Sequence, residues 1–216
     1  MEKHSAMGLR WLMLACFVWC TTPFRVAVAG AHGRLGRELV YQSLARRWDV
    51  IGLTRRPLDP LPAPVRRGFF AEDTRMRAPM RAENLKLVSF NRNATFDALI
   101  FCLSGRPFEE DDSDARVADL CASLPRSCKK VCLLSAFGAG DSLPANNPGI
   151  RAMESWYLRD VYASKRRQEA IVSALPSSVD VLIVRPRALS ICPVPFSPIS
   201  ISRQAMACEI LEWVAA

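Results

Sequence analysis

Histidine is scarce in this chain, whose 216 residues include only two histidines, His4 and His32. The eight cysteines follow none of the spacings that hold zinc. Cys102 and Cys132 lie within apolar runs, where cysteine behaves as a small buried hydrophobic residue. A chain of this length can bury a sizeable core without disulfide bonds. We therefore expect neither a structural metal site nor a disulfide framework.

The chain also lacks a long run of basic residues, although its formal net charge is +8. Many of its arginines are scattered as short pairs, such as Arg46-Arg47 and Arg166-Arg167. A surface that binds nucleic acid usually shows clustered basic residues. We therefore interpret the positive charge as a solvated surface and expect no nucleic acid partner.

The apolar run at residues 11–20 is too short to span a bilayer as a helix, which takes about 20 residues. Lys3 and Arg10 precede it, and a basic stretch followed by a short apolar run is typical of a signal peptide. We therefore interpret residues 1–24 as a separate segment that targets the protein to the secretory route or to an organelle. Two alternatives are a segment that associates with a membrane, and an apolar extension packed on a cytoplasmic domain.

Beyond Arg25 the sequence alternates between apolar runs and amphipathic stretches. Strands are predicted at residues 26–29, 50–53, 69–70, 96–103, 130–134 and 179–184. Helices are predicted at residues 35–48, 79–87, 115–124, 151–174 and 202–214. Strands that alternate with helices indicate an α/β domain, in which a parallel sheet is covered on both faces. Residues 25–216 are therefore expected to form one such domain.

A glycine turn carries the clearest functional signal, because it follows the first predicted strand and precedes the first predicted helix. Amides at a helix N-terminus point toward an anion, and glycine lets the backbone approach it closely. The turn therefore predicts a site for the pyrophosphate of a dinucleotide, in a doubly wound domain of the Rossmann type. A tight turn without a ligand is the alternative. The turn residues expected at the cofactor are Gly30, His32, Gly33, Arg34, Leu35 and Gly36.

The residues after the second predicted strand favour NADP(H) over NAD(H). An acidic residue at this point would bind the ribose 2′-hydroxyl, whereas arginine accommodates a 2′-phosphate. Here the strand is followed by Arg55 and Arg56, and no acidic residue occurs before Asp59. A solvated pair of arginines is the alternative interpretation. Ser104 and Gly105, which end another strong strand, are also expected near the cofactor, because ligands bind beyond the carboxyl ends of such strands.

Four stretches of the chain resemble the atypical short-chain dehydrogenase/reductases, the NAD(P)H-binding group that includes NmrA-like proteins and biliverdin reductase B-type flavin reductases. These stretches are residues 26–36, 165–170, 181–189 and 201–207, and they occur in the order of that family. In the family they form the pyrophosphate turn, the active-site helix, the strand leading to the substrate pocket and the last helix of the domain. The chain leaves little polypeptide after this helix for a substrate region.

The resemblance implies a catalytic serine, tyrosine and lysine, the tyrosine lying four residues before the lysine. Lys165 matches the lysine, and Ser135 matches the serine by its position at the end of a strand. Val161 occupies the tyrosine position, whereas Tyr162 lies three residues before the lysine. Residues three apart still share a helix face, so a nearby lysine could lower the pKa of Tyr162 and let it act as a general acid or base. A tyrosine that only packs on the helix is the alternative.

These observations leave three hypotheses for the function. The first is an NADP(H)-dependent oxidoreductase that acts on an unknown small molecule. The second is a non-catalytic dinucleotide-binding protein, such as a redox sensor, scaffold or assembly factor, which the altered tyrosine spacing favours. The third is an NAD(P)-dependent isomerase or epimerase, which would need the same residues and a larger C-terminal region.

Overall fold

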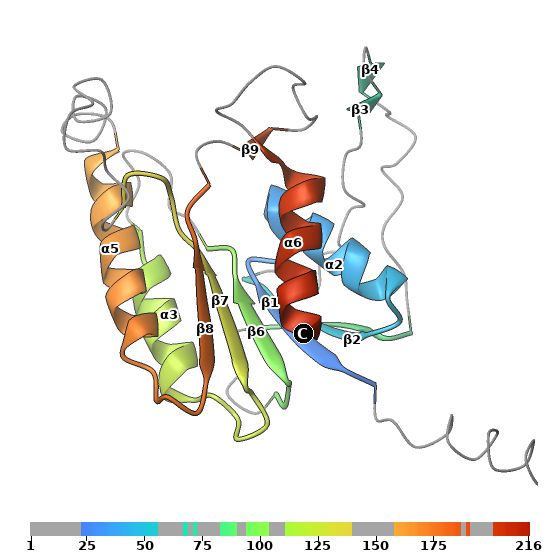
Figure 1. The fold of residues 1–216 in the computed structure, drawn as a ribbon, viewed down its shortest axis with the longest axis horizontal. Helices are drawn as coiled ribbons and strands as arrows, with labels where there is room; N and C mark the ends of the chain where they lie inside the picture. The colour runs from blue at the N-terminus through green and yellow to red at the C-terminus, as the bar shows by residue number, and fades with distance from the viewer. Residues whose placement is uncertain are drawn as a thin grey trace, which may run out of the picture.

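The computed structural model describes residues 23–55, 67–68, 71–72, 83–89, 94–103, 111–139, 158–186, 189–190 and 201–216 (Figure 1). The predicted targeting segment, apart from its last two residues, and the strand predicted at residues 69–70 lie outside this range. So do three of the expected cofactor residues, Arg56, Ser104 and Gly105. Within the described residues, none of the helices combines the length and apolar character needed to cross a membrane.

A parallel sheet of six strands forms the centre of the fold, and its strand order is β5-β2-β1-β6-β7-β8. Its strands are β1 (Arg25–Ala29), β2 (Asp49–Leu53), β5 (Leu85–Val88), β6 (Ala98–Phe101), β7 (Lys130–Leu134) and β8 (Asp180–Val184). Two short pairs lie outside this sheet: β3 (Arg67–Gly68) with β4 (Ala71–Glu72), and β9 (Leu189–Ser190) with β10 (Ile201–Ser202). The order confirms the predicted doubly wound, Rossmann-type α/β fold.

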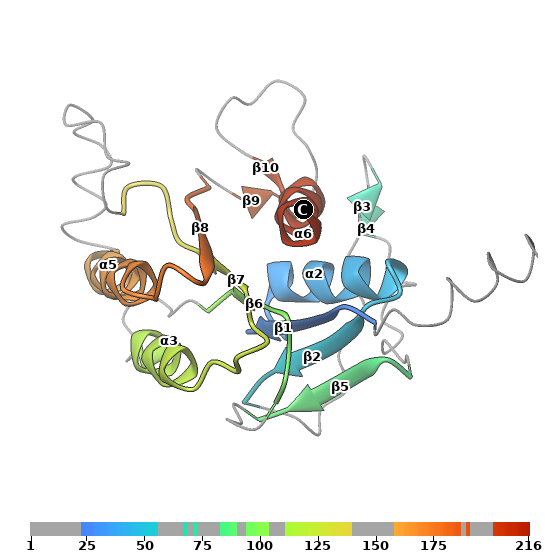
Figure 2. The ribbon, with the colours of Figure 1, turned by 60° about the horizontal axis from the view of Figure 1, so that its bottom comes forward.

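Among the described residues, four helices cover the two faces of the sheet (Figure 2). On one face lie α2 (Arg34–Ala45) and α6 (Arg203–Ala215), and on the other lie α3 (Ser113–Ala122) and α5 (Arg159–Ser173). Each helix pair packs together as well as on the sheet. The crossover between β1 and β2 therefore lies on the opposite face from the crossovers that follow β6 and β7.

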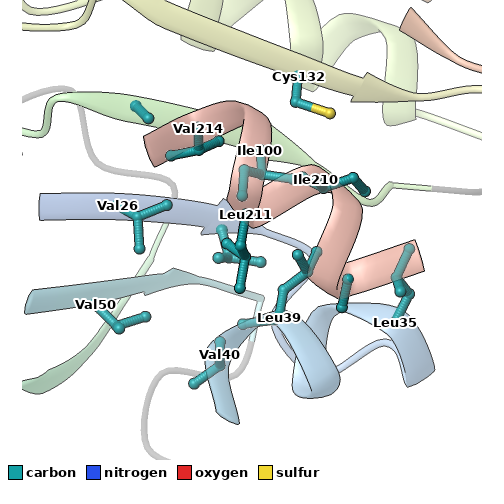
Figure 3. Packing of buried hydrophobic residues seen from close by; sticks show 14 of the residues in the cluster. Val26, Leu35, Leu39, Val40, Val50, Ile100, Cys132, Ile210, Leu211 and Val214 are labelled. Atoms are coloured by element: carbon teal, nitrogen blue, oxygen red, sulfur yellow. The ribbon is translucent and has the colours of Figure 1, made fainter. Parts of the chain in front are cut away.

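The side chains of β1 alternate between the two cores that result. Val26 and Val28 point into the core beneath α2 and α6, together with Leu39 and Leu211 (Figure 3). Ala27 and Ala29 point into the core beneath α3 and α5. Because both faces of the strand are buried, its sequence is a continuous apolar run rather than an alternating one.

The helix predicted at residues 79–87 is wrong where the structure describes that region. Residues 85–88 form β5, which pairs with β2 in the register Val50 to Leu85 and Leu53 to Val88. Leu85 and Leu87 pack against the core beneath α2 and α6. The alternation of Leu85 and Leu87 about Lys86 fits this strand, and the pairing with β2 fixes it.

Two other helices are shorter than predicted. The first ends at Ala45, and Arg47 adopts a φ of 60°, which turns the chain back toward the sheet. Trp48 therefore does not extend the helix, and its ring packs 4.8 Å from the ring of Phe24. The helix predicted at residues 151–174 is α5, with Leu158 as its N-cap, and residues 151–157 lie outside the described range.

Candidate functional site

The glycine turn leaves the carboxyl end of β1 through a backbone conformation that favours glycine. Gly30 has a φ of +85°, and its amide donates a hydrogen bond of 3.0 Å to the main-chain oxygen of Leu53 in β2. A Cβ atom at Gly30 would lie 2.7 Å from the main-chain oxygen of Cys102. Any other residue here would be strained and would displace the backbone that follows β6.

The turn delivers the chain directly into the N-terminus of α2. Gly33 is the N-cap and has no side chain to bond the helix amides, and the first helical turn contains no acidic residue. The first hydrogen bond across this end runs from the amide of Arg37 to the oxygen of Gly33, at 2.9 Å. The amides of residues 34–36 therefore have no intrahelical partner, and they can bind an anion.

At Gly36, α2 lies so close to the backbone of the turn that no side chain fits between them. A Cβ atom there would lie 2.2 Å from the main-chain oxygen of Gly30. His32 fastens the turn from the other side, since its Nδ1 is hydrogen-bonded to the Oγ1 of Thr54 at 2.7 Å. The turn is thus held between β1, β2 and α2. This uncapped, glycine-lined helix start fits the pyrophosphate of a dinucleotide.

Lys165 lies on α5 and is buried, with 4% of its surface exposed. Its Nζ donates three hydrogen bonds, to the main-chain oxygens of Leu103 at 2.5 Å and Leu134 at 2.9 Å and to the Oε1 of Gln168 at 3.2 Å. Burial lowers the pKa of this amine to about 8. The lysine is therefore mostly charged at neutral pH and lies where β6 and β7 end.

Tyr162 is also buried, and its hydroxyl donates a hydrogen bond of 2.8 Å to the main-chain oxygen of Phe137. Its ring packs on Gly138, whose φ is +97° and where a Cβ atom would lie 2.9 Å from a ring carbon. The tyrosine thus braces the loop that follows β7. These contacts agree with the alternative interpretation, in which Tyr162 packs and does not catalyse. The catalytic role of Tyr162 stays a prediction.

Ser135 is the first residue after β7, as predicted, and it is buried. Its Oγ forms no hydrogen bond with the described residues. Glu169, a residue of α5 that was not predicted from the sequence, has a pKa below its usual range. Burial raises that pKa, but two hydrogen bonds from Arg185, at 2.9 and 2.8 Å, act together with the positive charges of Arg185 and Lys165 and hold the pKa below its usual range. Glu169 therefore stays ionised and joins α5 to the end of β8.

A buried group of polar side chains between α3 and α5 was also missed. Gln168 accepts from Lys165 and donates to the hydroxyls of Ser113, at 2.6 Å, and Ser164, at 3.2 Å. The two hydroxyls lie 3.2 Å apart. The main-chain amide of Ser113 donates to the carboxylate of Asp111 at 2.9 Å. Single polar residues on a helix carry no sequence signal of this kind, because the contacts require both helices to be in place.

The carboxylate of Asp112 lies beside Arg55, the residue expected at a 2′-phosphate. One Nη2 hydrogen of Arg55 is donated to the Oδ1 of Asp112 at 2.6 Å. Arg116 donates to the Oδ2 of the same aspartate from its Nε, at 2.9 Å, and from its Nη2, at 2.5 Å. No acidic residue follows β2 closely in the sequence, but the carboxylate of Asp112, just before α3, lies beside the end of β2 in the structure.

These residues meet because the carboxyl ends of parallel strands share one edge of the sheet. Gly30 follows β1, Thr54 follows β2, Cys102 follows β6, Ser135 follows β7 and Arg185 follows β8. At this edge the crossovers after β1 and β6 leave toward opposite faces, which is the point where ligands bind in doubly wound sheets. The glycine turn, Ser135 and the amine of Lys165 therefore lie along one edge of the sheet, and their roles at a ligand stay predictions.

One cavity among the described residues lies toward the other end of the strands. It has a volume of about 490 Å³, and Arg25 and Asp49, the first residues of β1 and β2, line it. It is therefore separate from the glycine turn. No three histidine, cysteine or acidic residues of the described ranges are grouped so that they could hold a metal ion.

Comparison of the whole fold with solved structures gives many matches. An anaerobillin reductase from Escherichia coli, ChuY, matches with a TM-score of 0.61 and 17% identity, over 89% of this chain and 91% of the other. A short-chain dehydrogenase/reductase from Veillonella parvula matches with a TM-score of 0.61 and 15% identity, over 90% and 88%. The Bordetella bronchiseptica enzyme WbmH, solved in complex with NAD+, matches with a TM-score of 0.58 and 13% identity, over 90% and 73%.

No protein-family model matches the sequence, and no curated protein matches it either. At identities this low, the structural matches show the fold and do not transfer residue roles. The chain shares its fold with these structures and with one described as a putative NAD-dependent epimerase/dehydratase from Bacillus halodurans.

Proposed function

We propose that this protein binds an NAD(P) dinucleotide at the glycine turn and acts as an NADP(H)-dependent oxidoreductase on a small substrate. The observation that carries the proposal is the uncapped N-terminus of α2, which begins at Gly33 at the carboxyl end of β1. Free amides, glycine-lined backbone and the absence of acidic residues in the first turn all favour a bound pyrophosphate. When bound, the dinucleotide would supply or accept a hydride.

The residues at the ends of β6 and β7 would serve the other end of such a cofactor. The charged amine of Lys165 would hold the nicotinamide ribose by exchanging one of its three present acceptors for a ribose hydroxyl. Tyr162 would donate or accept the proton at its phenol oxygen, after release from the oxygen of Phe137. Ser135 would orient the substrate from the end of β7.

The arginines near the turn support NADP(H) rather than NAD(H). Arg55 and Arg56 follow β2, and Arg34 is exposed at the first position of α2. Their positive charges would favour a 2′-phosphate.

A non-catalytic dinucleotide-binding protein is the second candidate function. The hydrogen bond from the Tyr162 hydroxyl to the oxygen of Phe137 favours it, because a hydroxyl engaged in this bond holds the loop after β7 and does not donate its proton to a substrate. Both candidates require the same cofactor site, and they differ only in turnover.

Two variants at Gly33 test the cofactor site. Gly33 is exposed and has an extended backbone conformation, which is the conformation of an N-cap. Asp or Asn at this position can bond the free amides itself, and relative to glycine such a cap changes helix stability by only about a few tenths of a kcal/mol. Both variants place a Cβ 3.0 Å from the main-chain oxygen of Gly30, so the two share this tight contact and differ in charge. Gly33→Asp should abolish binding of NADPH, because its carboxylate competes with the pyrophosphate. Gly33→Asn is the uncharged control and should weaken binding far less.

Calorimetric titration with NADPH and NADH measures this difference, and thermal unfolding checks that both variants fold. Equal binding by Gly33→Asp and the parent would contradict the proposed site. Oxidation of NADPH by the parent, measured against a panel of quinones, flavins and carbonyl compounds, separates the two candidate functions. Turnover supports the oxidoreductase, whereas tight binding without turnover on any of them supports the non-catalytic protein.

A further inference from the structure

An ion pair lies across the carboxyl end of β1. Arg55 follows β2, and Asp112 immediately precedes α3, 57 residues later in the chain. Because β2 and β6 flank β1 in the sheet, and α3 belongs to the crossover after β6, this contact spans the strand that leads into the glycine turn. It therefore lies at the edge where a dinucleotide would bind.

The pair can open without leaving the aspartate alone. Both side chains are substantially exposed, Arg55 to 65% and Asp112 to 44%, so the attraction between them is weakened by solvent. Asp112 is held separately by two hydrogen bonds from Arg116, which lies four residues later on the same helix. These hydrogen bonds lower the pKa of Asp112, and the aspartate stays ionised at neutral pH. Arg55 is thus the movable partner.

We propose that Asp112 is a specificity-determining residue that competes with the 2′-phosphate of NADP(H) for Arg55. This inference rests on the proposed function and deepens it. A 2′-phosphate gains its contact with Arg55 only by displacing the carboxylate, whereas a ribose with a free 2′-hydroxyl needs no such exchange. Asp112 therefore lowers the ratio of NADPH affinity to NADH affinity below the value that Arg55 and Arg56 would otherwise give.

Affinities for NADPH and NADH, measured by calorimetry on the full chain, test the proposal through a double-mutant cycle. Asp112→Asn should tighten NADPH binding about two- to fivefold, the range expected for an exposed ion pair, and leave NADH binding nearly unchanged. In an Arg55→Gln background the same substitution should have no effect, because its target is gone. Arg116→Gln should act in the opposite direction, since Asp112 then depends on Arg55 alone, and NADPH affinity should fall.

Asp114→Asn is the matched control. It removes the same charge from the same helix, but Asp114 pairs with Arg167 on α5. A similar gain in NADPH affinity in this control would overturn the proposal, because the effect would then be general electrostatics. An unchanged ratio of the two affinities in Asp112→Asn would overturn it as well, as would a gain that persists without Arg55.

The outcome also separates this inference from the proposed function. If the parent binds NADPH and Asp112→Asn leaves the ratio unchanged, only the role of Asp112 fails. If the parent binds neither dinucleotide, the proposed cofactor site fails and the role of Asp112 is overturned with it. Weaker binding of NADH by Asp112→Asn would also overturn the competition, because it would place the carboxylate on the ribose.

Discussion

The Nζ of Lys165 lies 2.5 Å from the main-chain oxygen of Leu103, two residues beyond the end of β6. The same amine reaches the oxygen of Leu134, the last residue of β7. One charged group on α5 therefore holds the ends of two neighbouring strands. A change at Lys165 should affect both the candidate site and the stability of the fold.

We expect the contribution of Lys165 to stability to depend on pH. Its pKa is about 8 in the folded protein, against 10.5 for an ordinary lysine. Between these values the unfolded chain binds more protons than the folded one, so stability rises with pH in this window. The difference in unfolding free energy between the parent and Lys165→Met should therefore grow by roughly 3 kcal/mol from pH 8 to pH 10.5.

Urea denaturation at several pH values measures this difference. The Lys165→Met variant is the reference for the buried cysteines, because their thiols ionise in this pH range when the chain is unfolded, whereas burial raises their pKa to about 11 or 12 in the folded protein. A difference that stays constant from pH 8 to pH 10.5 would show that the lysine has an ordinary pKa.

Gln168 should set the pH at which the cofactor is released. If Lys165 holds the ribose as a cation, NADPH affinity should fall as the pH rises through about 8. Gln168→Leu removes an acceptor from the ammonium group and should move this fall to lower pH. Gln168→Glu places a negative charge there and should move it to higher pH.

The surroundings of residue 168 can accommodate the glutamate, because the hydroxyls of Ser113 and Ser164 can donate to it instead of accepting. Titration of NADPH binding across pH 6–10 in the three proteins provides the measurement. Identical profiles in all three would mean that another group titrates.

Tyr162→Phe deletes only a hydroxyl and should separate catalysis from packing. Loss of the hydrogen bond to the oxygen of Phe137 should cost about 1 kcal/mol of stability under either interpretation. If the phenol is the general acid, kcat should also fall by about 10²- to 10⁴-fold, with the affinity for NADPH nearly unchanged. Steady-state kinetics with the best substrate of the panel tests this, and an unaltered kcat would assign Tyr162 to packing alone.

Gly36→Ala should disrupt the turn more than its small size suggests. The added Cβ would meet the main-chain oxygen of Gly30 at 2.2 Å, and a backbone atom cannot move aside as a side chain does. We expect a loss of about 1–3 kcal/mol in stability and the loss of NADPH binding. Ser43→Ala, a buried position two turns further along α2, is a control whose cofactor binding should persist. Thermal unfolding and calorimetry measure the two effects, and normal binding by Gly36→Ala would contradict the proposed turn.

The sheet was largely predictable because its central strands can be recognised from short stretches of the sequence. β1 and β7 are buried on both faces, so each one is a continuous apolar run followed by a residue that ends it. Residues 85–87 of β5 were misassigned to a helix, although Leu85 and Leu87 alternate with Lys86 as in a strand, because four residues are too few for the alternation to be decisive without the pairing with β2. Helix ends were less predictable, since the left-handed residue that closes α2 is Arg47 rather than glycine.

The candidate site was predictable only where its residues lie in one short motif. The glycine turn is such a motif, and so is the pair of Tyr162 and Lys165 on one helix. Asp112, Gln168 and Glu169 were missed because each acquires its role from a partner on another element. The sequence has no acidic residue directly after β2, but in the folded protein the carboxylate of Asp112, 57 residues beyond Arg55, contacts Arg55 there.

The core beneath α2 and α6 joins the first helix of the domain to the last. Leu35 and Leu39 of α2 share it with Ile210 and Leu211 of α6, so these contacts connect distant parts of the chain (Figure 3). On the ribosome, α2 and the glycine turn emerge early, but the apolar surface that supports them stays open until α6 has been made. Contacts between such distant segments slow folding. The nascent chain should therefore acquire its nucleotide affinity only after α6 has left the ribosome, and a ribosome-bound chain lacking α6 should expose apolar surface that chaperones bind.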